Sequence, residues 1–215
     1  NKELIRRVIS SIILLPLTFY IIINGSFLLI FFTIVCFVIA SYEWIAMTKK
    51  NFYKIYGILF LMVSFYTFYL LSIEVFGVFF VILVCVSTDV GGYVFGKLLK
   101  GPKLTKISPN KTYAGMIGGY LLSLITLMII INHLDYSGIS IQFFLMTILI
   151  STTSQIGDII ISYFKRLSKI KNTGKLIPGH GGLLDRIDGM IFAFPIYYLV
   201  SLTGYFNLWK KKLQF

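Results

Sequence analysis

Residues 141–189, IQFFLMTILISTTSQIGDIIISYFKRLSKIKNTGKLIPGHGGLLDRIDG, show most clearly which kind of fold to expect. Its first half is an apolar run long enough to cross a bilayer, which takes about 20 residues. Its second half turns abruptly into a loop dense in Lys, Arg and Asp, with glycines between them. Because ionisable groups at a membrane boundary are costly, such a cluster indicates a functional site at the end of a membrane helix.

Long apolar runs and short charged loops alternate over the whole chain of 215 residues. Hydrophobic residues make up 57% of the sequence, charged residues only 13%, and the mean hydropathy is +0.87. Runs of spanning length predict seven segments, at 8–24, 27–48, 55–73, 75–95, 113–133, 141–164 and 188–208. We therefore expect an all-α fold, a polytopic transmembrane helical bundle of about seven to nine spans, with residues 1–215 forming a single integral-membrane catalytic domain.

The net charge of +12 is concentrated in four groups, before the first segment and after the second, fourth and sixth. This distribution places all four groups, and the two loop regions at 83–119 and 155–190, on the cytoplasmic face of the membrane. Lys210, Lys211 and Lys212 would then lie outside, so either the last segment is re-entrant or the count differs by one helix. Nucleic acid is not expected as a partner, because no soluble basic face is present.

The first loop region places a carboxylate inside an apolar span and a turn after it. Asp89 lies within the fourth segment, and Tyr93, four residues later, shares its helix face. Ser108, Lys111 and Thr112 belong to a turn that leads into a helix. Free N–H groups at that helix start, beside a lysine and two hydroxyls, would suit a phosphate group. The alternative is a plain loop with a helix N-cap.

The second loop region contains two closely spaced pairs of polar residues, and the second pair is acidic. Asp158 and Ser162 are four residues apart on one helix face, and Asp185 and Asp188 are three apart. Asp158 converging with Asp185 could bind Mg²⁺, which takes one or two carboxylates and keeps several waters. The alternative for the second pair is a local ion-pair network with Arg186 at a helix start. His180, in the glycine-rich loop, is a further candidate site residue. The alternative is that it is a loop histidine whose ring packs on a carbonyl.

At these residues the chain resembles the phosphatidate cytidylyltransferase family, also called CDP-diacylglycerol synthase. The family's signature is similar to this sequence at Ser162, Phe164, Lys165, Arg166, Pro178, Gly179, His180, Gly181, Gly182, Leu183, Asp185, Arg186, Ile187 and Asp188. A second block resembles it at Asp89, Tyr93, Gly96, Lys97, Ser108, Pro109, Lys111, Thr112 and Gly115, and Glu43-Trp44 resembles an early Glu-Trp pair. The chain departs from the family's usual residues at Ala114, Ile161 and Asn172.

The resemblance implies an enzyme of phospholipid biosynthesis in a bacterial-type plasma membrane. It would be a homodimer that uses CTP and phosphatidic acid to make CDP-diacylglycerol. Asp158 and Asp185 would bind magnesium, with Asp188 beside them, and His180 would bind pyrophosphate or orient a ligand. The remaining substrate-binding residues would be Lys111, Ser108, Thr112, Ser162, Lys165, Arg166, Arg186, Gly181, Gly182, Asp89 and Tyr93.

Two other functions fit a charged site in a membrane bundle. A CTP-dependent lipid kinase of the polyprenol or phytol type would transfer the γ-phosphate instead of the cytidylyl group. A non-enzymatic anion transporter would spread its charges along several helices at mid-depth, where broken helices meet. In this sequence the charges gather at one face, which argues against a transporter. The resemblance at His180, Gly181, Gly182, Asp185, Arg186 and Asp188 favours the cytidylyltransferase over the kinase.

Overall fold

The computed structural model of the chain describes residues 16–73, 75–105, 107–108, 111–133, 141–174, 176 and 181–203. The predicted helical bundle is confirmed: within these residues no strand longer than an isolated bridge forms. The named helices are α2 (Ser26–Met47), α3 (Asn51–Ser72), α4 (Val75–Leu99), α5 (Tyr113–His133), α6 (Ile141–Leu167), α7 (Leu184–Ile187) and α8 (Met190–Leu202). The five helices α2 to α6 are long and apolar enough to cross a membrane, so the chain is an integral membrane protein.

The first and last predicted segments differ from these five. Only 16–24 of the first segment is described; it is helical and ends at Gly25, whose φ is +57°. Of the last segment, 188–208, the described residues end at 203 and contain α8, with 13 residues. At 1.5 Å per residue this helix extends about 20 Å, less than the ~30 Å of a bilayer core. In the described part of the chain, α8 therefore does not span the membrane by itself.

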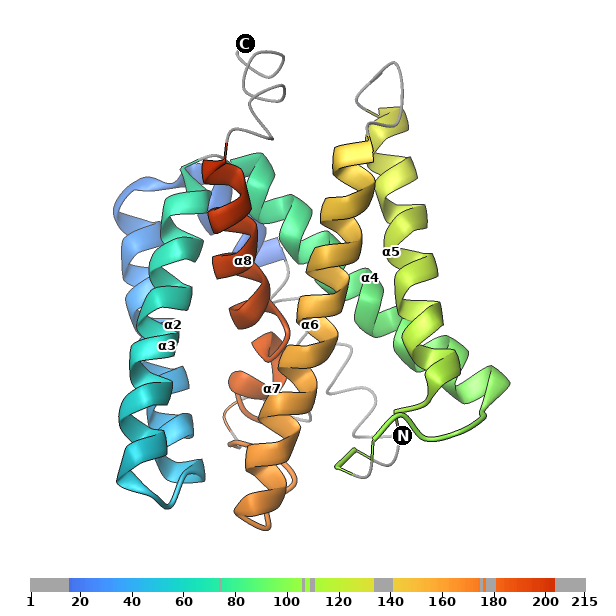
Figure 1. Cartoon of the computed structure of the whole chain (residues 1–215). Helices are drawn as coiled ribbons and strands as arrows, with labels where there is room; N and C mark the ends of the chain where they lie inside the picture. The colour runs from blue at the N-terminus through green and yellow to red at the C-terminus, as the bar shows by residue number, and fades with distance from the viewer. Residues whose placement is uncertain are drawn as a thin grey trace.

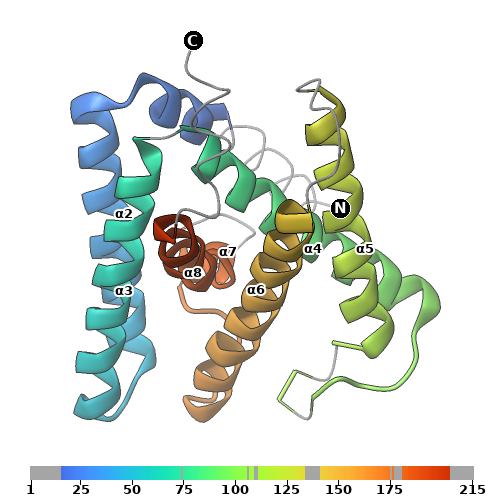
Figure 2. The same cartoon turned by 45° about the horizontal axis from the view of Figure 1, so that its top comes forward.

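The loops that contain the basic residues lie at one end of the bundle. The α2–α3 connection, the loop between α4 and α5 and the segment after α6 all lie at the bottom of Figure 1. The segment after α6 turns back into the bundle, where α7 and α8 lie between α3 and α6 (Figure 2). These three loops therefore lie at one end of the bundle, whereas the first basic group lies outside the described residues and the cytoplasmic orientation stays a prediction.

Two apolar clusters form the core. The larger one occupies the end of the bundle away from the basic loops and includes Phe68, Val78, Phe80, Ile150 and Phe194. The smaller cluster joins α2, α3, α6, α7 and α8 close to the charged loops; its buried members are Ala40, Trp44, Met47, Leu61, Ile161, Leu184 and Ile191. Ile161, where the resembling family usually has Glu, is 1% exposed in this cluster. Its apolar character is therefore explained by packing.

A close contact of glycines joins α4 to α5. A Cβ atom on Gly115 would lie 2.7 Å from the carbonyl oxygen of Gly92, and one on Gly91 would overlap the carbonyl group of Gly118. Small residues allow helix backbones to approach in this way. The contact fixes the position of α4, which contains Asp89, relative to the loop that precedes α5 (Figure 1).

Candidate functional site

Three carboxylates from separate parts of the chain interact at the end of the bundle that is predicted to face the cytoplasm. We call Asp89 of α4, Asp158 of α6 and Asp188, which follows α7, the carboxylate cluster. The carboxyl group of Asp188 interacts electrostatically with that of Asp158. Burial, followed by the charges of Asp158 and Asp89, raises the pKa of Asp188 well above its ordinary value of 3.8, and Lys165 opposes this rise. Carboxylates whose negative charges interact in this way favour binding of a cation or a proton.

Basic groups partly neutralise this cluster. The Lys111 Nζ atom lies 2.5 Å from Asp158 Oδ2, and both side chains are about a quarter exposed, at 24% and 29%. The hydroxyl of Ser162 donates to Asp158 Oδ1 over 3.3 Å. Lys111 and Arg186 both place positive charge near Asp89. The structure therefore brings together five of the predicted site residues, which are Asp89, Lys111, Asp158, Ser162 and Arg186.

The loop before α5 has the predicted turn and helix start. The Thr112 hydroxyl accepts the backbone N–H of Gly115 over 3.1 Å, as an N-cap does, and α5 begins at Tyr113. The backbone N–H of Lys111 donates to the Ser108 carbonyl over 3.0 Å, which closes the turn. Thr112 is thereby engaged in helix capping, whereas Lys111 extends to the carboxylate cluster.

Asp185 is bonded to a different set of groups. Its Oδ1 accepts the Lys165 ammonium over 2.9 Å, and its Oδ2 accepts the backbone N–H groups of Thr173 at 2.8 Å and Gly182 at 3.0 Å. Burial alone would raise the pKa of Asp185, but the Lys165 bond, the Gly182 N–H, the Lys165 charge and the Thr173 N–H together hold it below 3.8. Asp185 thus ties the 173–184 loop to α6.

The two adjacent cations at the end of α6 have different environments. The Lys165 side chain is 11% exposed and is paired with Asp185. Arg166 is exposed and its guanidinium donates to the Ile170 carbonyl over 3.4 Å. On α4, Tyr93 is 67% exposed, and its hydroxyl lies 3.5 Å from Lys97 Nζ. Lys165 therefore supports the loop, while the side chains of Arg166 and Tyr93 are exposed.

The glycine-rich part of the loop is described only from Gly181 onward. His180 lies outside the described residues, so its predicted role stays a prediction. Gly181 has φ of +90°, a conformation that L side chains rarely adopt, and a Cβ there would lie 2.6 Å from Asp185 Oδ2. Gly182 uses its N–H to bind the same carboxylate. Gly181 is thus explained by the close approach of the loop to Asp185, whereas a Cβ at Gly182 would overlap Thr173 and Glu43.

A metal site was predicted between Asp158 and Asp185, and it stays a prediction. Among the residues that the structure describes, no group of three or more His, Cys, Asp or Glu is arranged to hold a metal ion. A site of one or two carboxylates completed by water and phosphate oxygens, as Mg²⁺ prefers, has fewer protein ligands than that. Both oxygens of Asp185 already accept hydrogen bonds, from Lys165 and from two backbone N–H groups, so Asp188, whose charge interacts with that of Asp158, is the other candidate for the second carboxylate.

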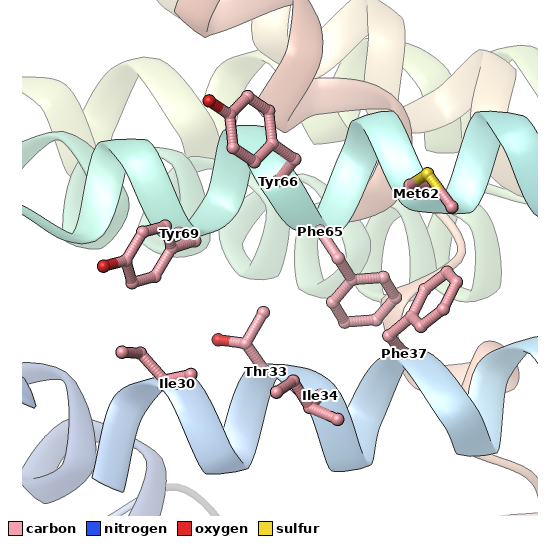
Figure 3. A pocket seen from close by; sticks show the side chains of 8 residues that line it. All are labelled: Ile30, Thr33, Ile34, Phe37, Met62, Phe65, Tyr66 and Tyr69. Atoms are coloured by element: carbon pink, nitrogen blue, oxygen red, sulfur yellow. The ribbon is translucent and has the colours of Figure 1, made fainter. Parts of the chain in front are cut away.

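A groove of about 340 Å³ lies elsewhere, between α2 and α3. Figure 3 shows its apolar lining, including the edge-to-face pair of Phe37 and Phe65, with ring centroids 6.0 Å apart. The lining residues are Ile30, Thr33, Ile34, Phe37, Met62, Phe65, Tyr66 and Tyr69. Because none of them is charged, the groove does not suit a phosphate-bearing group.

Two residues outside the set of predicted site residues also form contacts that hold the 173–184 loop. Glu43, buried on α2, and Thr173 are hydrogen-bonded to each other over 2.8 Å. The sequence contained a signal for Glu43, because an isolated acid within an apolar span is expected to have a buried partner. No comparable signal marks Thr173, whose importance depends on a contact across 130 positions of the chain.

Comparison with known proteins provides independent evidence of the family to which the chain belongs. The family described as the Cytidylyltransferase family matches residues 71–203. The chain is similar to the phosphatidate cytidylyltransferases of Staphylococcus saprophyticus, with 40% identity over 120 residues, and Staphylococcus haemolyticus, with 41% over 120 residues. Each match covers 55% of this chain and 46% of the relative. The enzyme of that name from Staphylococcus aureus is 36% identical over 129 residues, which are 59% of this chain and 49% of the relative. The matches thus span about half the length of these curated relatives.

Proposed function

The chain belongs to the cytidylyltransferase family, and from this premise we propose that it transfers the cytidylyl group of CTP to phosphatidic acid. The products would be CDP-diacylglycerol and pyrophosphate. One observation carries the proposal: the carboxylate cluster, Lys111 and Arg186 gather at the end of membrane helices. A lipid phosphate at the membrane surface and a soluble nucleotide triphosphate could meet there.

In this reaction an oxygen of the lipid phosphate attacks the α-phosphorus of CTP. A new P–O bond forms, the bond between the α-phosphorus and its bridging oxygen to the β-phosphate breaks, and pyrophosphate leaves with that electron pair. The attacking phosphate is already anionic, so no covalent intermediate with the protein is required. The task of the protein is to align two polyanions and to offset their repulsion.

The residues of this chain divide that task. Lys111 and Arg186 would bind phosphate oxygens, and Ser162 orients the carboxylate of Asp158 by its hydrogen bond. The exposed Arg166 lies at the end of α6, where it could meet the incoming nucleotide. Lys165 and Asp185 hold the 173–184 loop beside the cluster. His180 is proposed to contact the leaving pyrophosphate.

Magnesium is the cofactor that this chemistry calls for, and the donor set fits it. The carboxylate cluster provides hard oxygen ligands whose mutual repulsion a divalent cation would relieve. Asp158 and Asp188 would hold the ion, and Asp89 would add negative charge nearby. When bound, Mg²⁺ would neutralise charge on the phosphate groups.

We also propose that the site faces the cytoplasm of a bacterial plasma membrane, since CTP is available there and the basic loops gather at that end. The homodimer that the resemblance implies and the absence of nucleic-acid partners remain proposals as well. The lipid kinase and transporter alternatives are less favoured, because neither follows from membership of a cytidylyltransferase family.

Radiolabelled CTP and phosphatidic acid test the proposed reaction with the purified chain in detergent. Label from the α-phosphate should appear in the lipid product, while label from the γ-phosphate should appear in pyrophosphate. Lipid labelled only from the γ-phosphate would identify a kinase and contradict the proposal. Lipid labelled from neither position would contradict it as well.

A further inference from the structure

Glu43 stands out because it is a carboxylate inside an apolar membrane-length helix. It lies on α2 and is 3% exposed. Such a group is costly to bury unless hydrogen bonds replace its hydration. Glu43 also precedes residue 71, where the family match begins.

Three donors, all from the loop after α6, satisfy this carboxylate. Its Oε1 accepts the backbone N–H of Leu183 over 2.8 Å. Its Oε2 accepts the Thr173 hydroxyl over 2.8 Å and the backbone N–H of Leu184 over 2.9 Å. The donors lie on both described sides of the glycine-rich segment, so one side chain of α2 joins the two ends of the loop.

Two glycines of the loop fit closely around the same carboxylate. A Cβ on Gly174 would lie 2.7 Å from Glu43 Oε1. A Cβ on Gly182 would overlap Glu43 Oε2 and the Thr173 hydroxyl. The loop backbone therefore approaches Glu43 as closely as glycine permits.

The orientation of Glu43 is in turn fixed by its neighbour. The Trp44 indole donates to the Tyr53 carbonyl of α3 over 2.9 Å and packs edge-to-face on Phe164 of α6, with centroids 4.8 Å apart. Gly57 leaves room for the indole, which a Cβ at that position would overlap. Trp44 thus locks the rotation of α2 between α3 and α6, and this rotation directs Glu43 to the loop.

Thr173 connects Glu43 to the residues already placed at the site. Its hydroxyl binds Glu43, and its backbone N–H binds Asp185, which is paired with Lys165. Asp188 follows on the same short turn as Asp185. A displaced loop would therefore move Asp188 relative to Asp158.

We propose that Glu43 is a positioning residue that holds together the two described ends of the 173–184 loop, at Thr173 and at Leu183–Leu184, so that α2 contributes to the site from outside the family-matched region. The effect on catalysis rests on the proposed function, whereas the effect on the loop does not. Glu43→Gln preserves the shape of the side chain but replaces one acceptor oxygen with an amide donor facing N–H or O–H groups.

Hydrogen exchange of the full chain in detergent tests the effect on the loop directly. In Glu43→Gln, exchange of the Leu183 and Leu184 amides should accelerate at least about tenfold, because hydrogen bonds to a charged acceptor are lost. Peptides from α5 should exchange as in the wild type. Thr33→Val is the matched control, since it removes a hydrogen bond within α2 at a position 8% exposed and should leave the loop unchanged. Unchanged exchange at Leu183 and Leu184 in Glu43→Gln would overturn the proposal.

Kinetics with CTP test the consequence for the site. At equal amounts of folded protein, kcat/KM of Glu43→Gln should fall at least about tenfold, and Glu43→Asp, which restores a carboxylate, should recover part of the loss. If the wild type has no cytidylyl transfer, the proposed function fails, while the exchange result still decides the role of Glu43 in the loop. If Glu43→Gln does not fold, Thr173→Val removes one of the three bonds and should accelerate exchange at Leu184; no acceleration there would overturn the proposal.

Discussion

Lys111, in the loop before α5, forms an ion pair with Asp158 of α6, with 2.5 Å between Nζ and Oδ2. The pair joins two loop regions that are 47 positions apart and places an ammonium group beside the carboxylate cluster. A cation binding to the cluster would compete with Lys111 for Asp158. Lys111 could then turn to a phosphate of the nucleotide, for which a lysine is well suited.

This relationship predicts a selective effect of Lys111 on nucleotide use. Lys111→Met should lower kcat/KM for CTP by about tenfold or more, because a cation that offsets phosphate charge is lost. Lys111→Arg should retain more activity, since the charge remains. Lys103→Met, at an exposed position of the same loop, is the matched control and should change little. Equal kinetics for Lys111→Met and wild type would contradict the assignment.

The carboxylate cluster predicts which acids matter for magnesium. Asp158→Asn and Asp188→Asn should each lower turnover at saturating Mg²⁺ by at least about a hundredfold, because charge stabilisation worth several kcal/mol is lost. Both variants should remain monodisperse in detergent. Asp185→Asn should lower the melting temperature and leave the Mg²⁺ concentration for half-maximal activity unchanged. A large shift in that concentration would instead favour Asp185 as a metal ligand.

The bonds to Asp185 predict a loss of stability in acid. Because its folded-state pKa lies below 3.8, Asp185 contributes stability that is fully present above the unfolded-state value, about 3.9. This stability is lost as the pH falls through the lower, folded-state pKa. The melting temperature of the wild type should thus fall more steeply below about pH 4 than that of Asp185→Asn. Parallel curves for the two proteins would show that Asp185 does not contribute in this way.

The exposed position of Asn172 predicts that the substitution Asn172→Asp has only a modest effect on catalysis. In the structure it is exposed, and it lies beside Gly181. Restoring the carboxylate that the resembling family usually has should therefore strengthen at most an exposed pair, worth about 0–1 kcal/mol. Turnover of Asn172→Asp should change only a few-fold, roughly the factor that this energy corresponds to. A gain of about a hundredfold would identify this chain as a weakened relative.

The arrangement of the loops predicts the accessibility of single cysteines in intact cells. In a background without Cys36 and Cys85, an impermeant thiol reagent added outside should miss Lys103→Cys and Lys171→Cys, both at exposed positions of the basic end. It should label His133→Cys, exposed at the opposite end of α5. Labelling of only one of the two basic-end positions would contradict a single cytoplasmic site.

The sequence by itself determined the helical bundle and the position of its polar end. A membrane-spanning backbone must satisfy its own hydrogen bonds, so long apolar runs leave few folds other than helices. The start of α5 was also readable, since the cap by Thr112 depends on residues within one helical turn. The ion pair of Lys111 with Asp158 across the two loop regions was not predicted.

Only the tertiary structure decided which acid performs which task. Asp158, Asp185 and Asp188 are chemically alike in the sequence. In the structure Asp188 interacts electrostatically with Asp158, whereas Asp185 accepts hydrogen bonds from Lys165 and from the loop backbone. The contact of Glu43 with the loop was likewise decided by tertiary structure. The packing of Trp44 sets the rotation of α2 so that Glu43 faces Thr173, about 130 positions away in the chain. Local spacing predicts which residues share a helix face, but contacts between distant segments depend on how helices pack against one another.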